Sequence, residues 1–253
     1  MRRFVNSLIQ FRKPRTFWNE YYERKRRSND YLQTVDIRGG YKAIVPGILM
    51  SAFDEVFLRN VYQGSFKVSS DSTIIDIGAN VGYFTLYAFK NFRPARVLAI
   101  EAMPFNCELL EKHKEINNLQ NLEIVQKAVT SSEGQMEIGY QESLDYSVGA
   151  SMLNRVNSDK HITVETMSLD SVFEKYNVKR CALLKVDCEG AEYDIFLNAS
   201  ADTYKKIDNV VMELHDWVPK DIGVPNDLKL KLESNGFKVQ VWNDEIMFAI
   251  KVS

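Results

Sequence analysis

Residues Ile74–Thr85, IIDIGANVGYFT, are the most informative part of the sequence for the fold class. Its apolar start predicts a buried strand over Thr73–Ile77, and Gly78 and Gly82 then permit a tight turn into a helix expected over Gly82–Asn91. The N-terminus of such a helix presents unpaired N–H groups and a partial positive charge, which favour a carboxylate or a phosphate. Asp76, at the end of the strand, is placed to accept a hydrogen bond from a ligand ammonium group or from loop amides.

Strands and helices continue to alternate beyond this stretch, which indicates βαβ units and a parallel sheet. The last two strands are joined by residues 243–245 alone, a turn too short for a parallel crossover, so they must pair antiparallel. Gly236 ends the helix before them. The other predicted strands are Arg96–Ile100, Leu122–Gln126, Gln135–Tyr140, Cys181–Val186, Asn209–Leu214, Phe237–Trp242 and Ile246–Val252, and the other predicted helices are Phe105–Asn117, Ala191–Asn198 and Asp227–Ser234.

The N-terminal part of the chain is basic and aromatic. Residues 1–27 hold nine Arg or Lys against Glu20 and Glu23, whereas the rest of the chain holds 23 basic and 32 acidic residues. One interpretation is an amphipathic helix packed on the domain with its basic face in water. The other is a segment that contacts a membrane or another anionic partner. A hairpin is predicted over Asp36–Val45 and a helix over Phe53–Tyr62. Together with the basic arm they form an expected N-terminal cap, residues 1–69. The main domain is expected over residues 70–253.

The composition is that of an ordinary globular protein, with 253 residues, 45% hydrophobic and 26% charged. No apolar run approaches the roughly 18–20 residues that span a bilayer. Residues 1–13 lack the apolar run and cleavage site of a signal peptide. Three cysteines without CxxC spacing indicate neither a disulfide framework nor a zinc ribbon, so we expect a cytoplasmic protein.

Two features of the sequence limit which cofactor this site could bind. Glu101 ends the second predicted strand, where an acidic side chain can bond the ribose hydroxyls of an adenosine. In the dinucleotide fingerprint G-x-G-x-x-G, glycines would stand where this chain has Asn80 and Tyr83, so NAD and FAD are disfavoured. A ligand that combines an amino acid with an adenosine and has no pyrophosphate, such as S-adenosylmethionine, fits better.

Several ordered motifs resemble the FkbM-type methyltransferases: the Asp-x-Gly-Ala-Asn-x-Gly loop over 76–82, Ile100–Glu101 with Pro104, and LKVDCEGAE over 184–192. Ser168–Asp170 and Val211–His215 also match. The resemblance covers about residues 70–215 and excludes the arm. It implies an α/β, Rossmann-like class I methyltransferase fold, with a seven-stranded mostly parallel sheet, an antiparallel last strand and helices on both faces. It also implies S-adenosylmethionine as cofactor, S-adenosylhomocysteine as product, and O-methylation of a hydroxyl on a sugar, a glycan or a small metabolite.

The same resemblance implies the residues that bind the cofactor. The methionine part lies against the loop, Glu101 holds the ribose, and Ala102 and Met103 flank the adenine. Ala128 and Val129, after Lys127, complete the adenine pocket. Met103 and Val129 have an equal alternative as ordinary core residues. The loop residues are Asp76, Gly78, Ala79, Asn80 and Gly82.

The catalytic residues are expected beyond the carboxyl ends of later strands, where open α/β sheets bind ligands. Asp187, Glu189 and His215 follow two such strands. We expect His215 or Asp187 to act as a base toward a hydroxyl, while Glu189 and Glu192 have an alternative use at the start of the following helix. Mg²⁺ or Mn²⁺ could also be bound by Asp187, Glu189 and His215 together. The sequence does not decide whether the site holds a metal ion.

Three further expectations concern the surroundings of the site. His113 and His161 are expected at the surface. The segment Tyr140–Asn154 is either a loop that holds the acceptor or an ordinary solvent loop. Two other functions stay open: an RNA methyltransferase whose basic arm holds phosphates, and an NAD(P)-dependent oxidoreductase, which Asn80 and the terminal hairpin disfavour. No motif typical of DNA methylases is present, so no DNA partner is expected, and the oligomeric state is not predicted.

Overall fold

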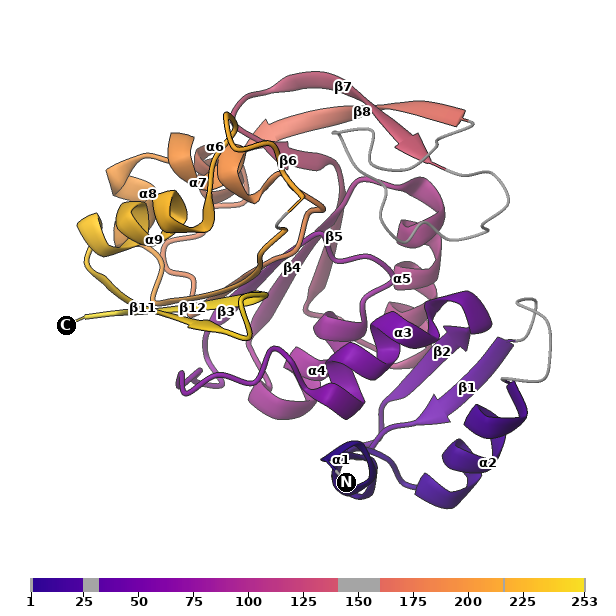
Figure 1. Cartoon of the computed structure of the whole chain (residues 1–253). Helices are drawn as coiled ribbons and strands as arrows, with labels where there is room; N and C mark the ends of the chain where they lie inside the picture. Colours follow the sequence, from indigo (N-terminus) through magenta and orange to yellow (C-terminus); the bar gives the residue numbers. More distant parts are fainter. Residues whose placement is uncertain (1, 25–31, 141–159, 216, 253) are drawn as a thin grey trace.

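A computed structural model describes residues 2–24, 32–140, 160–215 and 217–252 (Figure 1). Its central sheet has seven strands in the order β11-β12-β10-β9-β3-β4-β5. Strands β3, β4, β5, β9 and β10 are parallel, while β12 runs antiparallel to both β10 and β11. The predicted mixed sheet with an antiparallel last strand is therefore confirmed. The strands are β3 (Thr73–Ile77), β4 (Arg96–Glu101), β5 (Leu122–Gln126), β9 (Leu183–Val186), β10 (Asn209–Glu213), β11 (Phe237–Trp242) and β12 (Ile246–Lys251).

Helices cover both faces of this sheet because its buried strands alternate their apolar side chains between two clusters. Ile74 belongs to one hydrophobic cluster and its neighbour Ile75 to the other. The first cluster includes side chains of α4 (Tyr83–Phe92) and α5 (Pro104–Ile116). The second includes side chains of α6 (Leu169–Lys175), α7 (Glu192–Asn198), α8 (Ala201–Lys205) and α9 (Pro225–Ser234). The sequence predicted neither α6 nor α8, and the bounds of the predicted helices that correspond to α4, α5, α7 and α9 lie within two residues of those observed.

A second, three-stranded sheet has the order β6-β8-β7. Its strands are β6 (Ala128–Thr130), β7 (Gly134–Tyr140) and β8 (Lys160–Ser168). Strand β7 corresponds to the predicted strand at Gln135–Tyr140. The expected acceptor loop over Tyr140–Asn154 lies, apart from its first residue, outside the described residues.

The N-terminal segment forms two helices, a hairpin and a helical turn. The hairpin strands are β1 (Leu32–Asp36) and β2 (Lys42–Pro46), so its first strand begins earlier than predicted. The predicted helix at 53–62 is instead continuous from a 3₁₀ turn, η1 (Gly47–Leu49), through α3 (Met50–Phe53) to a π-helical turn, η2 (Asp54–Arg59). It ends where Asn60 adopts a left-handed φ of 56°. The two helices are α1 (Arg2–Gln10) and α2 (Pro14–Arg24).

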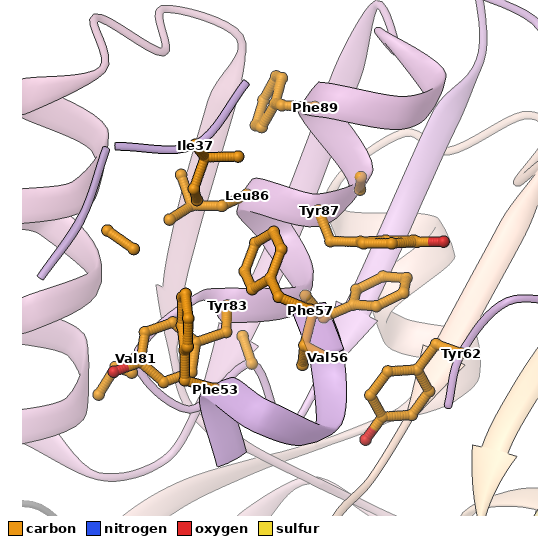
Figure 2. Packing of buried hydrophobic residues seen from close by; sticks show 14 of the residues in the cluster. Ile37, Phe53, Val56, Phe57, Tyr62, Val81, Tyr83, Leu86, Tyr87 and Phe89 are labelled. Atoms are coloured by element: carbon orange, nitrogen blue, oxygen red, sulfur yellow. The ribbon is translucent and has the colours of Figure 1, made fainter. Parts of the chain in front are cut away.

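Aromatic rings join this segment to the main sheet (Figure 2). Phe53 meets Tyr83 of α4 edge to face with ring centroids 5.2 Å apart, and Tyr62 meets Phe84 in the same way at 5.4 Å. Such pairs add about 0.5–1.5 kcal/mol each beyond the area that they bury. The buried hydrophobic residues from Phe11 to Phe66 belong to the same hydrophobic cluster as α4. The segment therefore shares a core with the sheet.

The expectation that His113 lies at the surface is wrong, and the interpretation of the arm as an amphipathic helix packed on the domain holds for α2, whose Phe17 is buried, but not for α1. His113 is fully buried: its Nδ1 lies 2.6 Å from the carbonyl oxygen of Val81, and its Nε2 accepts the N–H of Ile44 at 2.7 Å. Burial lowers the pKa of His113 to about 4, so the imidazole is neutral. Helix α1, in turn, does not bury an apolar face, since its buried side chains are Ser7 and Gln10. His161 is exposed, as predicted. No described helix is both long and apolar enough to cross a membrane.

Candidate active site

The loop after β3 and the end of β9 meet at the base of a cleft. Gly78 has a φ of +67°, and a Cβ atom added there would lie 1.8 Å from the carbonyl oxygen of Asp187. Only a glycine permits both this backbone conformation and this approach. The N–H of Asp187 also donates to the carbonyl oxygen of Ile77. The predicted cofactor loop and the predicted catalytic Asp187 are thus in direct contact.

A buried lysine ties the two strands together beneath the cleft. The Nζ of Lys185 donates to the carbonyl oxygen of Gly78 at 2.8 Å, and it lies 3.3 Å from Asp76 Oδ1 and 3.5 Å from Asp187 Oδ2. Burial alone would lower the pKa of Lys185, but the carboxylates of Asp76 and Asp187 outweigh it and raise that pKa. The lysine is therefore a buried cation that neutralises two carboxylates.

Asp76 lies below the loop rather than in the wall of the cleft. It is fully buried, and its Oδ2 accepts the hydroxyl hydrogen of Thr85 at 2.7 Å. The expectation that Asp76 contacts the ligand directly does not match this position, because its side chain turns toward α4 and Lys185. Ala79 and Gly82 likewise do not line the cleft, whereas Gly78 and Asn80 do.

Glu101 stands at the opposite side of the loop and lines the cleft. Its Oε2 accepts the N–H of Asn80 at 2.7 Å, while its Oε1 accepts the N–H of Met103 at 2.9 Å and the side-chain amide of Asn106 at 3.3 Å. A carboxylate has roughly four acceptor positions, so about one remains for a ligand hydroxyl. Burial raises the pKa of Glu101, and the hydrogen bonds counteract that rise.

The side chains expected around an adenine gather beside Glu101. Ala102, Met103, Ala128 and Val129 all line the cleft, together with Ile138 of β7. Met103 is only 1% exposed and Val129 only 4%, so both are core residues and cleft residues at once. Apart from Asn106 and Lys127, the side chains beside Glu101 at this end of the cleft are apolar, which suits a flat heteroaromatic ring.

The other end of the cleft is acidic. Glu55, Asp187, Glu189 and Glu213 line it together. The hydroxyl of Tyr62 lies 3.0 Å from Asp187 Oδ2 and 3.2 Å from Glu213 Oε2. Burial, followed by the charge of Asp187, raises the pKa of Glu213 to about 8. The Tyr62 hydroxyl can donate to either carboxyl group, so it bridges Asp187 and Glu213.

His215 lies behind this acidic end and does not line the cleft. Its Nδ1 is 3.1 Å from Glu192 Oε1, and its Nε2 is 3.6 Å from Glu189 Oε2. Burial opposes the charge of His215, but the hydrogen bond to Glu192 and the nearby carboxylates raise its pKa to about 9. The imidazole therefore carries a proton at neutral pH. It is held as a cation and is not poised to accept a proton.

The carboxylate of Glu192 closes the turn that carries Cys188 and Gly190. Its two oxygens accept the N–H groups of these residues at 2.7 and 3.0 Å. This matches the alternative, structural use considered for Glu192. Burial and then the charge of Glu192 raise the pKa of Cys188, so its thiol is not an activated nucleophile.

A metal would have to displace existing contacts. Asp187, Glu192 and His215 each offer one ligand atom, and these atoms lie within 4.8 Å of one another. Glu192 already accepts two backbone N–H groups, His215 is protonated, and Asp187 faces the Lys185 ammonium group. A divalent cation would have to compete with the proton of His215 and with these donors for the same atoms.

Four residues of the site were not foreseen from the sequence: Glu55, Tyr62, Lys185 and Glu213. Lys185 could have been identified from the sequence, because a lysine inside an otherwise apolar strand must have buried partners. Tyr62 and Glu55 could not, since helical spacing indicated only which apolar side chains of that segment are buried. Glu213 ends a buried strand, as Glu101 does, and that position was its signal.

The fold and the cleft at the carboxyl ends of its strands define the class I methyltransferases. The family model described as the methyltransferase FkbM domain matches residues 76–239. The chain is 28% identical over 205 residues to Methyltransferase 1 of Beauveria bassiana, which covers 74% of this chain and 80% of that protein. Hexuronic acid methyltransferase AglP of Haloferax volcanii is 25% identical over 157 residues, or 62% of each chain.

One solved structure confirms the architecture. The methyltransferase FkbM of Methylobacillus flagellatus KT superimposes with a TM-score of 0.50 at 12% identity, covering 94% of this chain and 59% of that one. The present chain belongs to the FkbM methyltransferase family and is a methyltransferase.

Proposed function

We propose that the chain transfers a methyl group from S-adenosylmethionine to a hydroxyl of an uncharged sugar or a small hydroxylated metabolite. The observation that carries this proposal is the polarity of the cleft, which is apolar beside Glu101 and acidic around Asp187. S-adenosylmethionine has a flat base, a ribose and a sulfonium cation. The apolar end suits the base, the remaining acceptor position of Glu101 suits a ribose hydroxyl, and the carboxylates suit the cation.

The cofactor supplies an electrophilic methyl group and leaves as a neutral thioether, S-adenosylhomocysteine. The protein has to hold the acceptor oxygen about 3–3.5 Å from that carbon, in line with the breaking C–S bond. As the new C–O bond forms, the hydroxyl loses its proton. We assign Asp187 as the base that takes this proton.

The contacts of Asp187 support this assignment. The described contacts of its carboxylate, with Tyr62 and Lys185, both use Oδ2, so Oδ1 is available to an acceptor. The lysine cation and the tyrosine hydroxyl keep the carboxylate oriented. His215 is less suited, because its raised pKa leaves it protonated and it lies behind the cleft wall. In our proposal Glu189 and His215 position this edge of the site.

The acidic end also bears on the acceptor. The acidic side chains around this cleft, with Asp187 and Glu189 among them, repel phosphates, which argues against RNA and favours an uncharged polyol. The relative from Haloferax volcanii is named for a hexuronic acid, which supports a sugar acceptor in general. A carboxylated sugar would meet the same repulsion in this cleft, so we favour a neutral one.

An acceptor screen tests the proposal. Methyl-labelled S-adenosylmethionine is incubated with the protein and with neutral sugars, uronic acids or a short single-stranded RNA, and the labelled product is identified by mass spectrometry. We expect an ether methyl group on a neutral hydroxylated acceptor, formed at a rate that Asp187→Asn lowers about 100-fold or more. Transfer to RNA alone, or to a nitrogen atom, would refute the O-methyltransferase assignment.

A further inference from the structure

Helix α1 is amphipathic, but unlike a helix that packs on a core it turns its polar face to the protein and its apolar face to solvent. Its buried side chains are polar, and its apolar ones face solvent. At about 100° per residue, positions 4, 5, 8 and 9 share one face of the helix. The exposed fractions are 57% for Phe4, 46% for Val5, 45% for Leu8 and 55% for Ile9.

The polar face of α1 is fastened to the rest of the molecule. The side-chain amide of Asn6 donates to the carbonyl oxygen of Leu58 at 2.7 Å, and Arg3 pairs with the buried Asp54 at 2.5 Å. Both partners belong to η2, the turn that also carries Glu55 of the cleft. The outward direction of the apolar face is therefore set by specific contacts.

Basic side chains surround this apolar face. Arg2, Arg12, Lys13 and Arg15 are exposed on or just after α1. A groove between α1 and α2 continues the same surface, and Phe4, Leu8, Trp18 and Lys13 are among its lining residues. Figure 1 places both helices at the periphery of the molecule, beside the N-terminus.

We propose that α1 inserts its apolar face into the surface of a bilayer that contains anionic lipids. An apolar helix face bordered by Arg and Lys is typical of helices that lie in the membrane interface. The charge distribution favours the same orientation, because residues 28–253 hold 23 basic against 32 acidic residues and are repelled by an anionic surface. RNA is a less suitable partner, because it has no apolar surface that would bury the aliphatic side chains of α1. A second copy of the chain is also less suitable, because the two basic surfaces would repel each other.

Vesicle co-sedimentation of the full chain tests the proposal, with vesicles of phosphatidylcholine alone or mixed with phosphatidylglycerol. We expect binding to the mixed vesicles that weakens with salt. The double variant Phe4→Ser/Leu8→Ser should lower the partition coefficient about tenfold or more, because it removes two inserting side chains. Its melting temperature should match that of the native chain, since both side chains are exposed. Leu230→Ser is the matched control, because Leu230 is 55% exposed on α9 and should not affect binding.

A charge series completes the test. Replacing Arg12, Lys13 and Arg15 by Gln should lower binding to mixed vesicles by about fivefold for each charge removed. Absence of native binding to the mixed vesicles would overturn the proposal, as would equal binding of the Phe4→Ser/Leu8→Ser variant. So would a dimer, seen by light scattering, that this variant converts to monomers, because the face would then be an interface between copies. Binding to single-stranded RNA that needs the three charges but not Phe4 and Leu8, without vesicle binding, would point to RNA instead.

Discussion

The hydroxyl of Tyr62 lies 3.0 Å from Oδ2 of Asp187, although the two residues are 125 positions apart in the chain. Tyr62 follows the π-helical turn η2, and Asp187 follows β9. The same turn places Glu55 in the cleft. The N-terminal segment is therefore part of the candidate active site, because it supplies a wall of the acidic end and one partner of the proposed base.

Tyr62→Phe isolates the role of this hydroxyl. The ring and its contact with Phe84 are kept, but Asp187 and Glu213 lose their bridging partner. We expect kcat to fall roughly tenfold, since a hydrogen bond to a charged group is worth about 1.5–3 kcal/mol. Affinity for S-adenosylhomocysteine should stay unchanged. Tyr41→Phe is a suitable control, because its hydroxyl bonds only weakly to the carbonyl oxygen of Phe89. Equal kcat values for Tyr62→Phe and the native chain would show that the bridge is not used in catalysis.

Asp187→Asn tests the base. The amide has nearly the same shape as the carboxylate but cannot take up the acceptor proton. We expect kcat to fall roughly 100-fold or more, in line with the loss of general-base catalysis, while binding of S-adenosylhomocysteine persists. Glu111→Gln, on the exposed side of α5, should retain full activity. A variant Asp187→Asn that turns over at the native rate would exclude Asp187 as the base.

Gly78→Ala and Gly40→Ala form a matched pair for the loop. Both glycines have a positive φ, +67° and +92°, but a Cβ on Gly40 meets nothing within 4 Å, whereas one on Gly78 meets the carbonyl oxygen of Asp187. In urea unfolding, Gly78→Ala should therefore lower the free energy of unfolding by about 1–3 kcal/mol more than Gly40→Ala does. Gly78→Ala should also weaken cofactor binding. Equal losses would mean that the loop and the end of β9 are not in close contact.

His215 should make a pH-dependent contribution to stability. Its pKa is raised from 6.5 to about 9 in the folded state, so the folded protein binds the proton more tightly than the unfolded chain. The stabilisation is complete below pH 6.5 and is lost as the pH rises to about 9. The free energy of unfolding of the native chain minus that of His215→Gln should accordingly fall over this range in urea titrations. A difference that stays constant or grows with pH would contradict the ion pair with Glu192.

The sequence predicted most of the sheet because its signals are local. Gly78 and Gly82 indicate a tight loop between a strand and a helix. The three residues 243–245 permit only an antiparallel hairpin. The side-chain partners were harder to predict. Asp76 was expected to bond a ligand ammonium group or loop amides, yet it turns to Thr85 and Lys185, because a strand residue points to one face of the sheet and not along the strand.

His113 shows the same limit in a helix. Leu109 and Leu110 are buried on α5, and His113 follows them by four and three positions, on the same face. Its partners Ile44 and Val81 come from two other elements, and no local pattern identifies them. Helix α1 was misjudged for a different reason. Its pattern shows two faces, but only the folded structure shows which of them meets the protein.

Calorimetry with S-adenosylhomocysteine shows whether the cleft between Gly78 and Glu101 binds S-adenosylmethionine. The native chain should bind this product, while NAD should not bind. Glu101→Gln should weaken the affinity about tenfold or more, because a charged acceptor is lost from the ribose site, with an unchanged far-ultraviolet circular dichroism spectrum. Absence of binding to the native chain, or native affinity in Glu101→Gln, would contradict this account of the site.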